Sequence, residues 1–360
     1  SNAFYNCTNV KPLSYNTNAI GNVFSDKALL ESVNIGNDVT VISENAFSGC
    51  KKLSSITIPA SITNVGKNAF YGCDSLTMII TESNADFRGS NLRFIKDSIG
   101  YAVLKKDSVE VVSNSYLNKA VIPSSVSFGN IFAVTGISDN AFKGNGVTSV
   151  NIPSTIAVIG ASAFENCNNL ASVDIPESVK NIGANAFKNC SGLEIISISS
   201  SMTEIGNGAF GGCGNVKKLS YNTNAIGTHF SDKATLETLE IGSAVTSISE
   251  NAFSNCNKLK TVVIPTNVTE IGANAFKNNK GQIICLAETP ITLSADPFPN
   301  NDTIFVPASC EDTYKAQSVW KRKEILPWCT VTVSSSDETM GTVENVSYCG
   351  AGCSTTIKAI

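Results

Sequence analysis

Hydrophobic and polar residues alternate over short stretches of this chain, and the stretches return at a regular spacing. In one of them the apolar Val173 and Ile175 alternate with the polar Ser172 and Asp174. This period of two predicts a strand with one buried and one exposed face. A proline follows such stretches and ends the strand, because it has no N–H with which to extend a ladder. These prolines are Pro59, Pro153, Pro176 and Pro265.

The dipeptide Ala-Phe marks the repeat. Its phenylalanine recurs mostly every 22 or 23 residues, at Phe47, Phe70, Phe142, Phe164, Phe187, Phe210, Phe253 and Phe276. Phe24, Phe230 and Phe298 continue the spacing without the alanine. A period of this length is typical of a solenoid, whose stacked coils bury each other's apolar groups. We therefore expect the phenylalanines to form a column inside the coils.

Each unit reads approximately LxxVxIPxSVxxIGxxAFxxC, as in Leu170–Cys190. The VxxIG segment predicts a second short strand that leads into a corner. At this corner the glycine is expected to adopt positive φ; its copies are Gly66, Gly160, Gly183, Gly206 and Gly272. A block of several coils is duplicated as well, since residues 10–59 return at residues 216–265.

These motifs resemble the leucine-rich repeats of the BspA-like family, whose units also read IPxxVxxIGxxAFxxCxxL. The resemblance covers residues 4–307. It implies a bacterial surface or secreted protein with a β-rich leucine-rich-repeat solenoid, in which parallel strands form one face and short strands and turns form the other. The pattern weakens at about residues 82–135, where we expect irregular coils and a hairpin insert at the sequence SFGNIFA.

The two ends of the chain are expected to differ from the repeats. Residues 1–3 are interpreted as the remnant of an expression tag, and both ends as cuts in a longer protein. Residues 308–327 predict a short C-terminal capping helix, with a capping box of Ser309 and Asp312. It would place Tyr314, Gln317 and Trp320 along one side. Residues 328–360 alternate as strands and resemble the start of a small, truncated β module.

Composition removes several function classes. Charged residues are 16% of the chain and the net charge is -4, so no basic surface for nucleic acid is expected. No apolar run reaches the roughly 18 residues that cross a membrane, so we expect no membrane insertion of this chain. The one histidine, His229, is replaced by Val23 in the other copy of the duplicated block. We therefore expect no catalytic residues. We also expect no cofactor and a monomer.

Cysteine is the residue type that could suggest a metal site or a disulfide framework. Most of the twelve cysteines instead occupy a slot three residues after phenylalanine, where asparagine also occurs. In leucine-rich repeats this N/C slot holds a small group that bonds neighbouring backbone. Its members are Cys50, Cys73, Asn145, Cys167, Cys190, Cys213, Cys256 and Asn279. Structural thiols are favoured over disulfides between adjacent coils, and no metal site is expected.

Cys349 and Cys353 lie outside the repeats and flank a glycine-rich turn. They could bridge each other, pair with Cys329, bind a metal or remain unpaired thiols.

The outward positions of the strands form the candidate binding face. They are mostly small and uncharged, and include Ser55, Thr57, Met78, Ile80, Ser149, Asn151, Ser172, Asp174, Ile195, Ser197, Thr238 and Glu240. Met78, Ile80 and Ile195 are apolar and either mark a contact patch or pack beneath the insert. We expect a non-catalytic extracellular or cell-surface protein that binds a host or microbial surface protein or glycan. The alternatives are a structural spacer and, more remotely, a glycoside-directed enzyme.

Overall fold

The chain forms two units of stacked coils. The computed structural model describes residues 9–114, 119–293, 295–330 and 348–350. Unit 1 comprises Ser1–Leu170, Asp174–Lys188 and Glu204–Ala209, and unit 2 comprises Ala171–Val173, Asn189–Thr203 and Phe210–Ile360. The strand β16 (Ser172–Asp174) has residues in both units.

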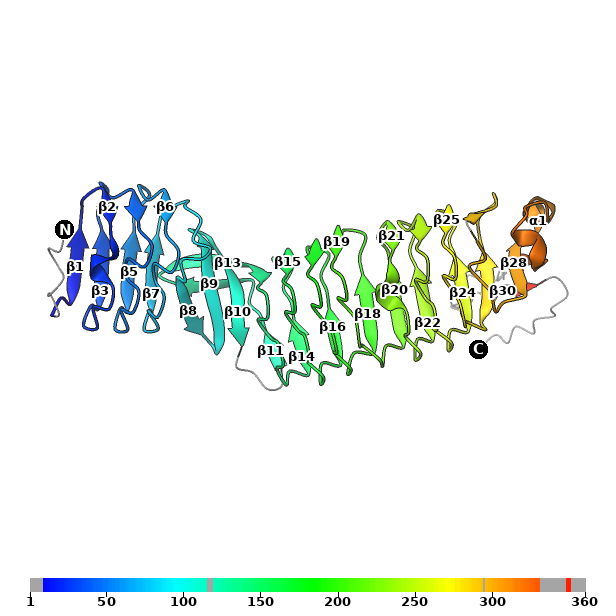
Figure 1. Ribbon diagram of the computed structural model, residues 1–360, viewed down its shortest axis with the longest axis horizontal. Coiled ribbons are helices and arrows are strands. Elements are labelled where there is room, and N and C mark those ends of the chain that lie inside the picture. The colour runs from blue at the N-terminus through cyan, green and yellow to red at the C-terminus, as the bar shows by residue number, and fades with distance from the viewer. Residues whose placement is uncertain (1–8, 115–118, 294, 331–347, 351–360) are drawn as a thin grey trace, which may run out of the picture. The chain divides into compact units, whose positions relative to one another are not determined.

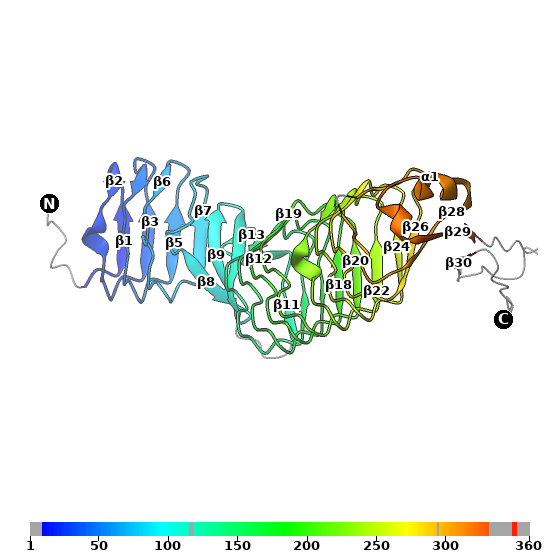
Figure 2. The same cartoon turned by 45° about the vertical axis from the view of Figure 1, so that its right-hand side comes forward.

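Unit 1 begins with two parallel sheets on two sides of the same coils. The longer strands are β1 (Pro12–Tyr15), β3 (Ser32–Ile35), β5 (Ser55–Ile58) and β7 (Met78–Thr81), which lie side by side in Figures 1 and 2. The short strands are β2 (Ala19–Ile20), β4 (Val41–Ile42) and β6 (Asn64–Val65). A 3-10 helix, η1 (Asn22–Phe24), follows β2. Each coil therefore contributes one long and one short strand, as the repeat predicts.

An antiparallel insert interrupts the regular coils of unit 1. It contains β8 (Arg93–Lys96), β9 (Ile99–Lys105) and β10 (Ser108–Asn114), followed by the hairpin of β12 (Ser125–Phe128) and β13 (Asn130–Ile137). The hairpin turn lies against the edge of β7. There Gly129 forms a β-bridge with Ile79, and Asn130 Nδ2 donates to the Thr81 carbonyl across 2.7 Å. The hairpin thus shields part of the edge that β7 would otherwise leave open.

After the insert the regular coils resume within unit 1. The short-strand sheet continues from β10 through β13 to β15 (Val158–Ile159), β17 (Asn181–Ile182) and β19 (Glu204–Ile205). The long strands there are β11 (Lys119–Val121) and β14 (Ser149–Asn151), which pair in parallel.

Unit 2 repeats the same plan. Its long strands are β18 (Ile195–Ile198), β20 (Lys218–Tyr221) and β22 (Thr238–Ile241), and then β24 (Thr261–Ile264), β26 (Gln282–Cys285) and β28 (Thr303–Pro307). Its short strands are β21 (Ala225–Ile226), β23 (Ser247–Ile248), β25 (Glu270–Ile271) and β27 (Thr292–Leu293). The 3-10 helix η2 (Thr228–Phe230) matches η1 in the duplicated block. These parallel strands confirm the predicted β-rich solenoid.

The phenylalanine column is confirmed within each unit. Phe164 stacks on Phe187 in unit 1 with ring centroids 5.1 Å apart, and Phe276 stacks on Phe298 in unit 2 at 5.5 Å. These rings are at most 1% exposed. Because each ring contacts the ring of the next coil, the column turns a local repeat into a continuous core.

The C-terminal cap differs from its prediction. The helix α1 covers only Glu311–Lys315, follows the 3-10 helix η3 (Ala308–Cys310) and lies beside β28 (Figure 1). Its N-cap is Cys310 and no side chain caps it, so the predicted capping box of Ser309 and Asp312 is wrong. Gln317 is exposed beyond the helix end, and therefore does not share a buried side with Tyr314.

Trp320, in η4 (Trp320–Arg322), instead continues the aromatic column. Its ring lies 6.1 Å from that of Phe298, the residue 22 positions earlier, and 5.0 Å from that of Tyr314. The strand β29 (Glu324–Thr330) then pairs in parallel with β28, and β30 (Tyr348–Gly350) pairs antiparallel to β29. The cap is therefore a last, altered coil that carries a helix. The remainder of the predicted β module, residues 331–347 and 351–360, lies outside the described residues.

The corner glycines are needed for space and not for positive φ, so that prediction was wrong. A Cβ on Gly183 would lie 2.4 Å from the backbone nitrogen of Ala161 in the preceding coil. The other corner glycines, Gly66, Gly160, Gly206 and Gly272, would place a Cβ 2.2 to 2.5 Å from backbone nitrogen in the same way. Positive φ falls instead on the turn around phenylalanine, for example at Asn45 (57°) and Gly49 (74°) on either side of Phe47.

Candidate functional site

The outward positions of the long strands are accessible in both units. In unit 1, Ser55 lies opposite Met78 and Thr57 opposite Ile80 in the β5–β7 register, while the residues between them are buried. All twelve residues of the predicted face are exposed or half-buried. The strands thus separate core positions from surface positions, because successive side chains point to opposite faces of a sheet.

The three apolar residues of this face do not form one patch within a unit. Met78 and Ile80 lie on β7 of unit 1, and Ile195 lies on β18 of unit 2. Met78 is 44% exposed although the insert borders β7, and Ile80 is half-buried. Ile195 is 49% exposed, with Ser172 and Lys218 as its strand neighbours. Each unit therefore presents its own exposed apolar residue on a long strand.

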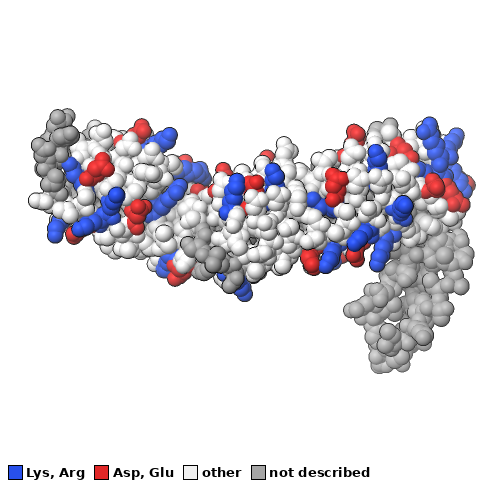
Figure 3. All heavy atoms as spheres, turned by 60° about the horizontal axis from the view of Figure 1, so that its bottom comes forward, with Lys and Arg blue, Asp and Glu red and all other residues white. Residues whose placement is uncertain are grey.

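The charged residues of the unit 2 face are paired with each other. Lys218 Nζ lies 2.6 Å from a carboxylate oxygen of Glu240, and the Ser220 hydroxyl donates to the same carboxylate. The hydrogen bond from Lys218, followed by the one from Ser220, lowers the pKa of Glu240. On the side drawn in Figure 3, the described Lys and Arg residues are interspersed with Asp and Glu, and uncharged surface lies between them. A ligand held mainly by a field of one sign is therefore disfavoured.

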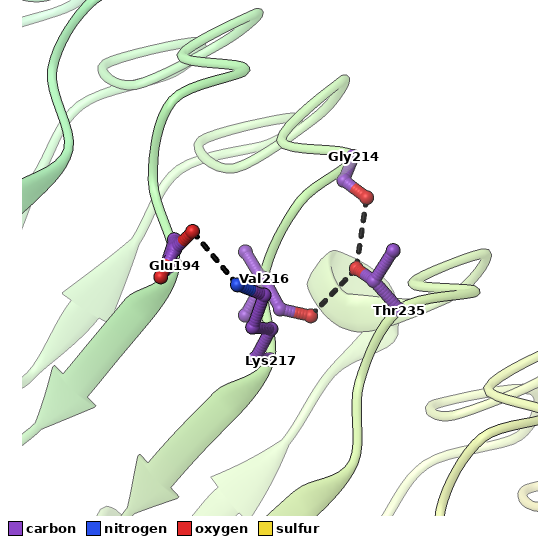
Figure 4. Close-up of polar contacts among 5 residues, drawn as sticks. All are labelled: Glu194, Gly214, Val216, Lys217 and Thr235. Carbon is purple, nitrogen blue, oxygen red and sulfur yellow. Dashed lines mark hydrogen bonds and ion pairs between the residues drawn. The ribbon is translucent and has the colours of Figure 1, made fainter.

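Polar contacts between coils border this face. Lys217 donates its backbone N–H to the Glu194 carbonyl across 2.8 Å (Figure 4), and its Nζ lies 2.8 Å from the Glu194 carboxylate. In the next coil the Thr235 hydroxyl lies 2.8 Å from the carbonyl oxygens of both Gly214 and Val216 (Figure 4). These contacts hold neighbouring coils together and leave the outward strand positions accessible.

The N/C slot lies inside the coils. The thiol of each of four slot cysteines donates to the carbonyl of the phenylalanine in the preceding coil: Cys50 to Phe24, Cys73 to Phe47, Cys167 to Phe142 and Cys256 to Phe230, across 3.0 to 3.4 Å. Asn279 Nδ2 donates to the Cys256 and Leu259 carbonyls, and the Asn145 side chain accepts from the Val147 N–H. Cys190 and Cys213 are buried as well. The slot therefore satisfies backbone carbonyls that the strands do not reach.

Burial makes these thiols poor nucleophiles. It raises the pKa of Cys50, Cys167 and Cys213 to about 11 and the pKa of Cys73 and Cys256 to about 12. Since the thiolate is the reactive form, the slot offers little thiol chemistry near neutral pH.

Two lysines of unit 2 whose side chains are largely buried occupy the same slot, which the sequence pattern had not revealed. Lys233 lies three residues after Phe230, and Lys323 lies three residues after Trp320. Lys233 Nζ donates to the Phe210 carbonyl across 2.9 Å, and Lys323 Nζ donates to the Phe298 carbonyl across 2.7 Å. Counting three residues from each column ring would have found them.

The remaining candidates for chemistry are His229, Cys349 and Cys353. His229 is half-buried beside Phe230, and its burial lowers its pKa. Among the described residues, no group of three or more His, Cys, Asp and Glu could hold a metal ion, and no helix has the length and apolar character to span a membrane. The backbone register places Cys349 opposite Cys329, whereas Cys353 lies outside the described residues. A disulfide at Cys349 and Cys353 stays a prediction.

The chain matches known leucine-rich repeats. A comparison with curated proteins finds no match. Among solved structures, a leucine-rich cell surface protein from Faecalibacterium prausnitzii A2-165 is 26% identical with a TM-score of 0.49, and the match covers 62% of this chain and 66% of that one. A leucine-rich repeat protein from Bacteroides ovatus ATCC 8483 is 21% identical with a TM-score of 0.46, covering 90% of this chain and 85% of that one.

The model of the BspA type leucine-rich repeat region matches residues 17–131, 135–232 and 225–312, in six copies. These matches span well over half of the chain and coincide with the coils described above. The chain therefore belongs to the BspA-type leucine-rich repeat family.

Proposed function

We propose that this protein is a non-catalytic repeat protein of the cell surface or the extracellular space, which binds a host or microbial surface protein or glycan through its outward strand face. The chemistry of that face carries the proposal. In unit 1 the outward positions of the strands from β3 to β7 are uncharged and include the exposed Met78. Burying such a surface against a partner requires little desolvation of charge.

The duplicated block supports the same proposal. Residues 14–21 and 220–227 are identical, and internal bonds explain why: Tyr221 donates to the Ala225 carbonyl, and the Asn222 side chain accepts from the Ala244 N–H. Outward strand positions differ between the copies, as in Asn34 and Glu240 or Thr57 and Val263. The scaffold is thus retained while the exposed face varies, as expected where each copy contacts its own part of a partner.

A structural spacer is the second candidate. It is favoured by the self-pairing of Lys218, Glu240 and Ser220, which leaves little free charge on the unit 2 face. A spacer needs a rigid stack of coils but no accessible contact point.

A binding experiment separates the two candidates. The protein is tested against panels of matrix proteins and glycans, and any positive partner is then titrated with the Met78→Ser and Ile195→Ser variants. We expect at least one of them to weaken binding by about tenfold, since a buried apolar anchor contributes about 1 to 2 kcal/mol.

Val158→Ser is the matched control, because Val158 is 46% exposed but lies on the short strand β15. It should leave affinity unchanged. If no panel member binds, or if all three variants bind as tightly as the unchanged protein, the strand face is not the binding surface and the spacer function is favoured.

A further inference from the structure

The two lysines of the N/C slot in unit 2 differ in their electrostatic surroundings. Lys233 is 5% exposed, and the Lys323 side chain is 7% exposed. Both donate to the carbonyl of the preceding ring of the column. Lys323 also has a carboxylate of Asp296 at 2.9 Å. Within the described residues, Lys233 has no carboxylate within 4.0 Å.

The groups that face Lys233 do not neutralise it. The slot residues of the coils before and after it are Cys213 and Cys256, whose raised pKa values keep them uncharged near neutral pH. The adjacent carboxylate, Asp232, accepts from Asn255 Nδ2 at the exposed edge of the coils, across 2.6 Å. Among the described residues, the surroundings of the Lys233 side chain therefore supply one carbonyl but no counter-ion.

A buried ammonium without a carboxylate is costly, whereas a neutral amine in the same place costs far less. Burial accordingly lowers the pKa of Lys233, against smaller opposite effects of Cys213, Cys256 and Asp232. The folded coil then binds fewer protons than the unfolded coil at pH values between the lowered pKa of Lys233 and the ordinary lysine pKa of about 10.4. In that window its stability rises with pH.

We propose that the unpaired ammonium of Lys233 makes its coil a pH-sensitive weak point of unit 2, which opens locally at neutral pH and closes more firmly as the amine loses its proton. The coil belongs to the second copy of the duplicated block, where Lys233 is the counterpart of the likewise buried Lys27 in the first copy. Lys323 differs from Lys233 because the Asp296 carboxylate pairs with it in the folded state.

Hydrogen exchange tests the proposal. The full chain, Lys233→Asn and Lys233→Met are compared at about pH 7 and about pH 10, on peptides that cover residues 230–237. Asparagine supplies a slot donor like Asn279, and methionine keeps the chain length without charge or donor. At about pH 7 we expect Lys233→Asn to be about tenfold better protected than the unchanged protein, and we expect this ratio to shrink at about pH 10.

Because the variants are compared at the same pH, the effect of pH on the chemical exchange rate cancels in the ratio of their protection. All variants carry the same cysteines, so the titration of these thiols cancels in the ratio as well. Lys233→Met should show the same narrowing of the ratio, because it also lacks the charge. Equal or lower protection of Lys233→Asn at about pH 7, or a ratio that does not change with pH, would overturn the proposal.

Asp296→Asn provides an independent check. It removes the counter-ion of Lys323 and should weaken protection of residues 320–326 at about pH 7 by about tenfold, with no effect on residues 230–237. Unchanged protection of residues 320–326 would show that an unpaired ammonium is tolerated in this slot, and would also overturn the proposal.

Discussion

The thiol of Cys167 donates a hydrogen bond to the carbonyl oxygen of Phe142, 3.0 Å away in the preceding coil. Both residues are fully buried, so no water replaces this donor if it is removed. The same relationship recurs at three other described slot cysteines. It joins the column of phenylalanines to the coil stack by polar contacts.

Replacing Cys167 by alanine should therefore lower the free energy of unfolding by about 1 to 3 kcal/mol, because the Phe142 carbonyl loses its buried donor. Urea unfolding followed by circular dichroism measures the change. Asn151→Ala is the control on the exposed face of β14, and it should alter stability by no more than about 0.5 kcal/mol. Equal effects of the two substitutions would contradict the structural role of the thiol.

Alkaline pH should destabilise the protein through its buried thiols. Their pKa values of about 11 to 12 in the folded state lie above the ordinary cysteine value of 9.0, so the folded state holds these protons more tightly than the unfolded state. The stability that they contribute is fully present below about pH 9 and is lost as pH rises through about 11 to 12. Melting temperature measured from about pH 8 to about pH 11 should fall, and Cys167→Ser, whose hydroxyl does not ionise, should flatten the fall. An unchanged slope in that variant would contradict this cause.

Gly183→Ala should destabilise unit 1 although its backbone φ is ordinary. The new Cβ would lie 2.4 Å from the Ala161 nitrogen. Because the rigid backbone of the preceding coil would have to move, we expect the free energy of unfolding to fall by about 1 to 3 kcal/mol. Gly21→Ala is the matched control in the same unit, since no atom lies within 4 Å of its Cβ. It should be neutral or slightly stabilising. Thermal unfolding of the two variants distinguishes lack of space from backbone conformation.

Trp320→Ala should remove the end of the aromatic column. Trp320 is 2% exposed, and its Nε1 donates to the Ile291 carbonyl across 3.3 Å. We therefore expect the substitution to lower the free energy of unfolding by about 3 to 5 kcal/mol. Gln317→Ala, three residues earlier but exposed, should have almost no effect. Protease resistance and urea unfolding measure the stability of both variants. A similar loss in the two variants would mean that the segment packs as a longer helix than α1.

The repeat made the fold predictable, because each coil needs the same groups at the same places. The spacing from Phe276 to Phe298 correctly extended the column, and the alternation in β16 correctly separated Val173 from Ser172 and Asp174. The candidate face was likewise readable as exposed, but its apolar residues could not be assigned to units. Met78 and Ile195 occupy equivalent strand positions, and only the contacts of the folded chain place them in different units.

The sequence by itself determined the coil, its strands and its aromatic core, since these depend on local alternation and on a period that each coil shares with the next. Only the tertiary structure showed that Gly183 is needed for lack of space and that Trp320 closes the last coil against Phe298. It also showed that Lys323, and not Lys233, has a counter-ion among the described residues. Each of these depends on the distance between atoms in neighbouring coils, or on a side chain such as Asp296 reaching across from another turn. Such distances exist only after the coils have stacked.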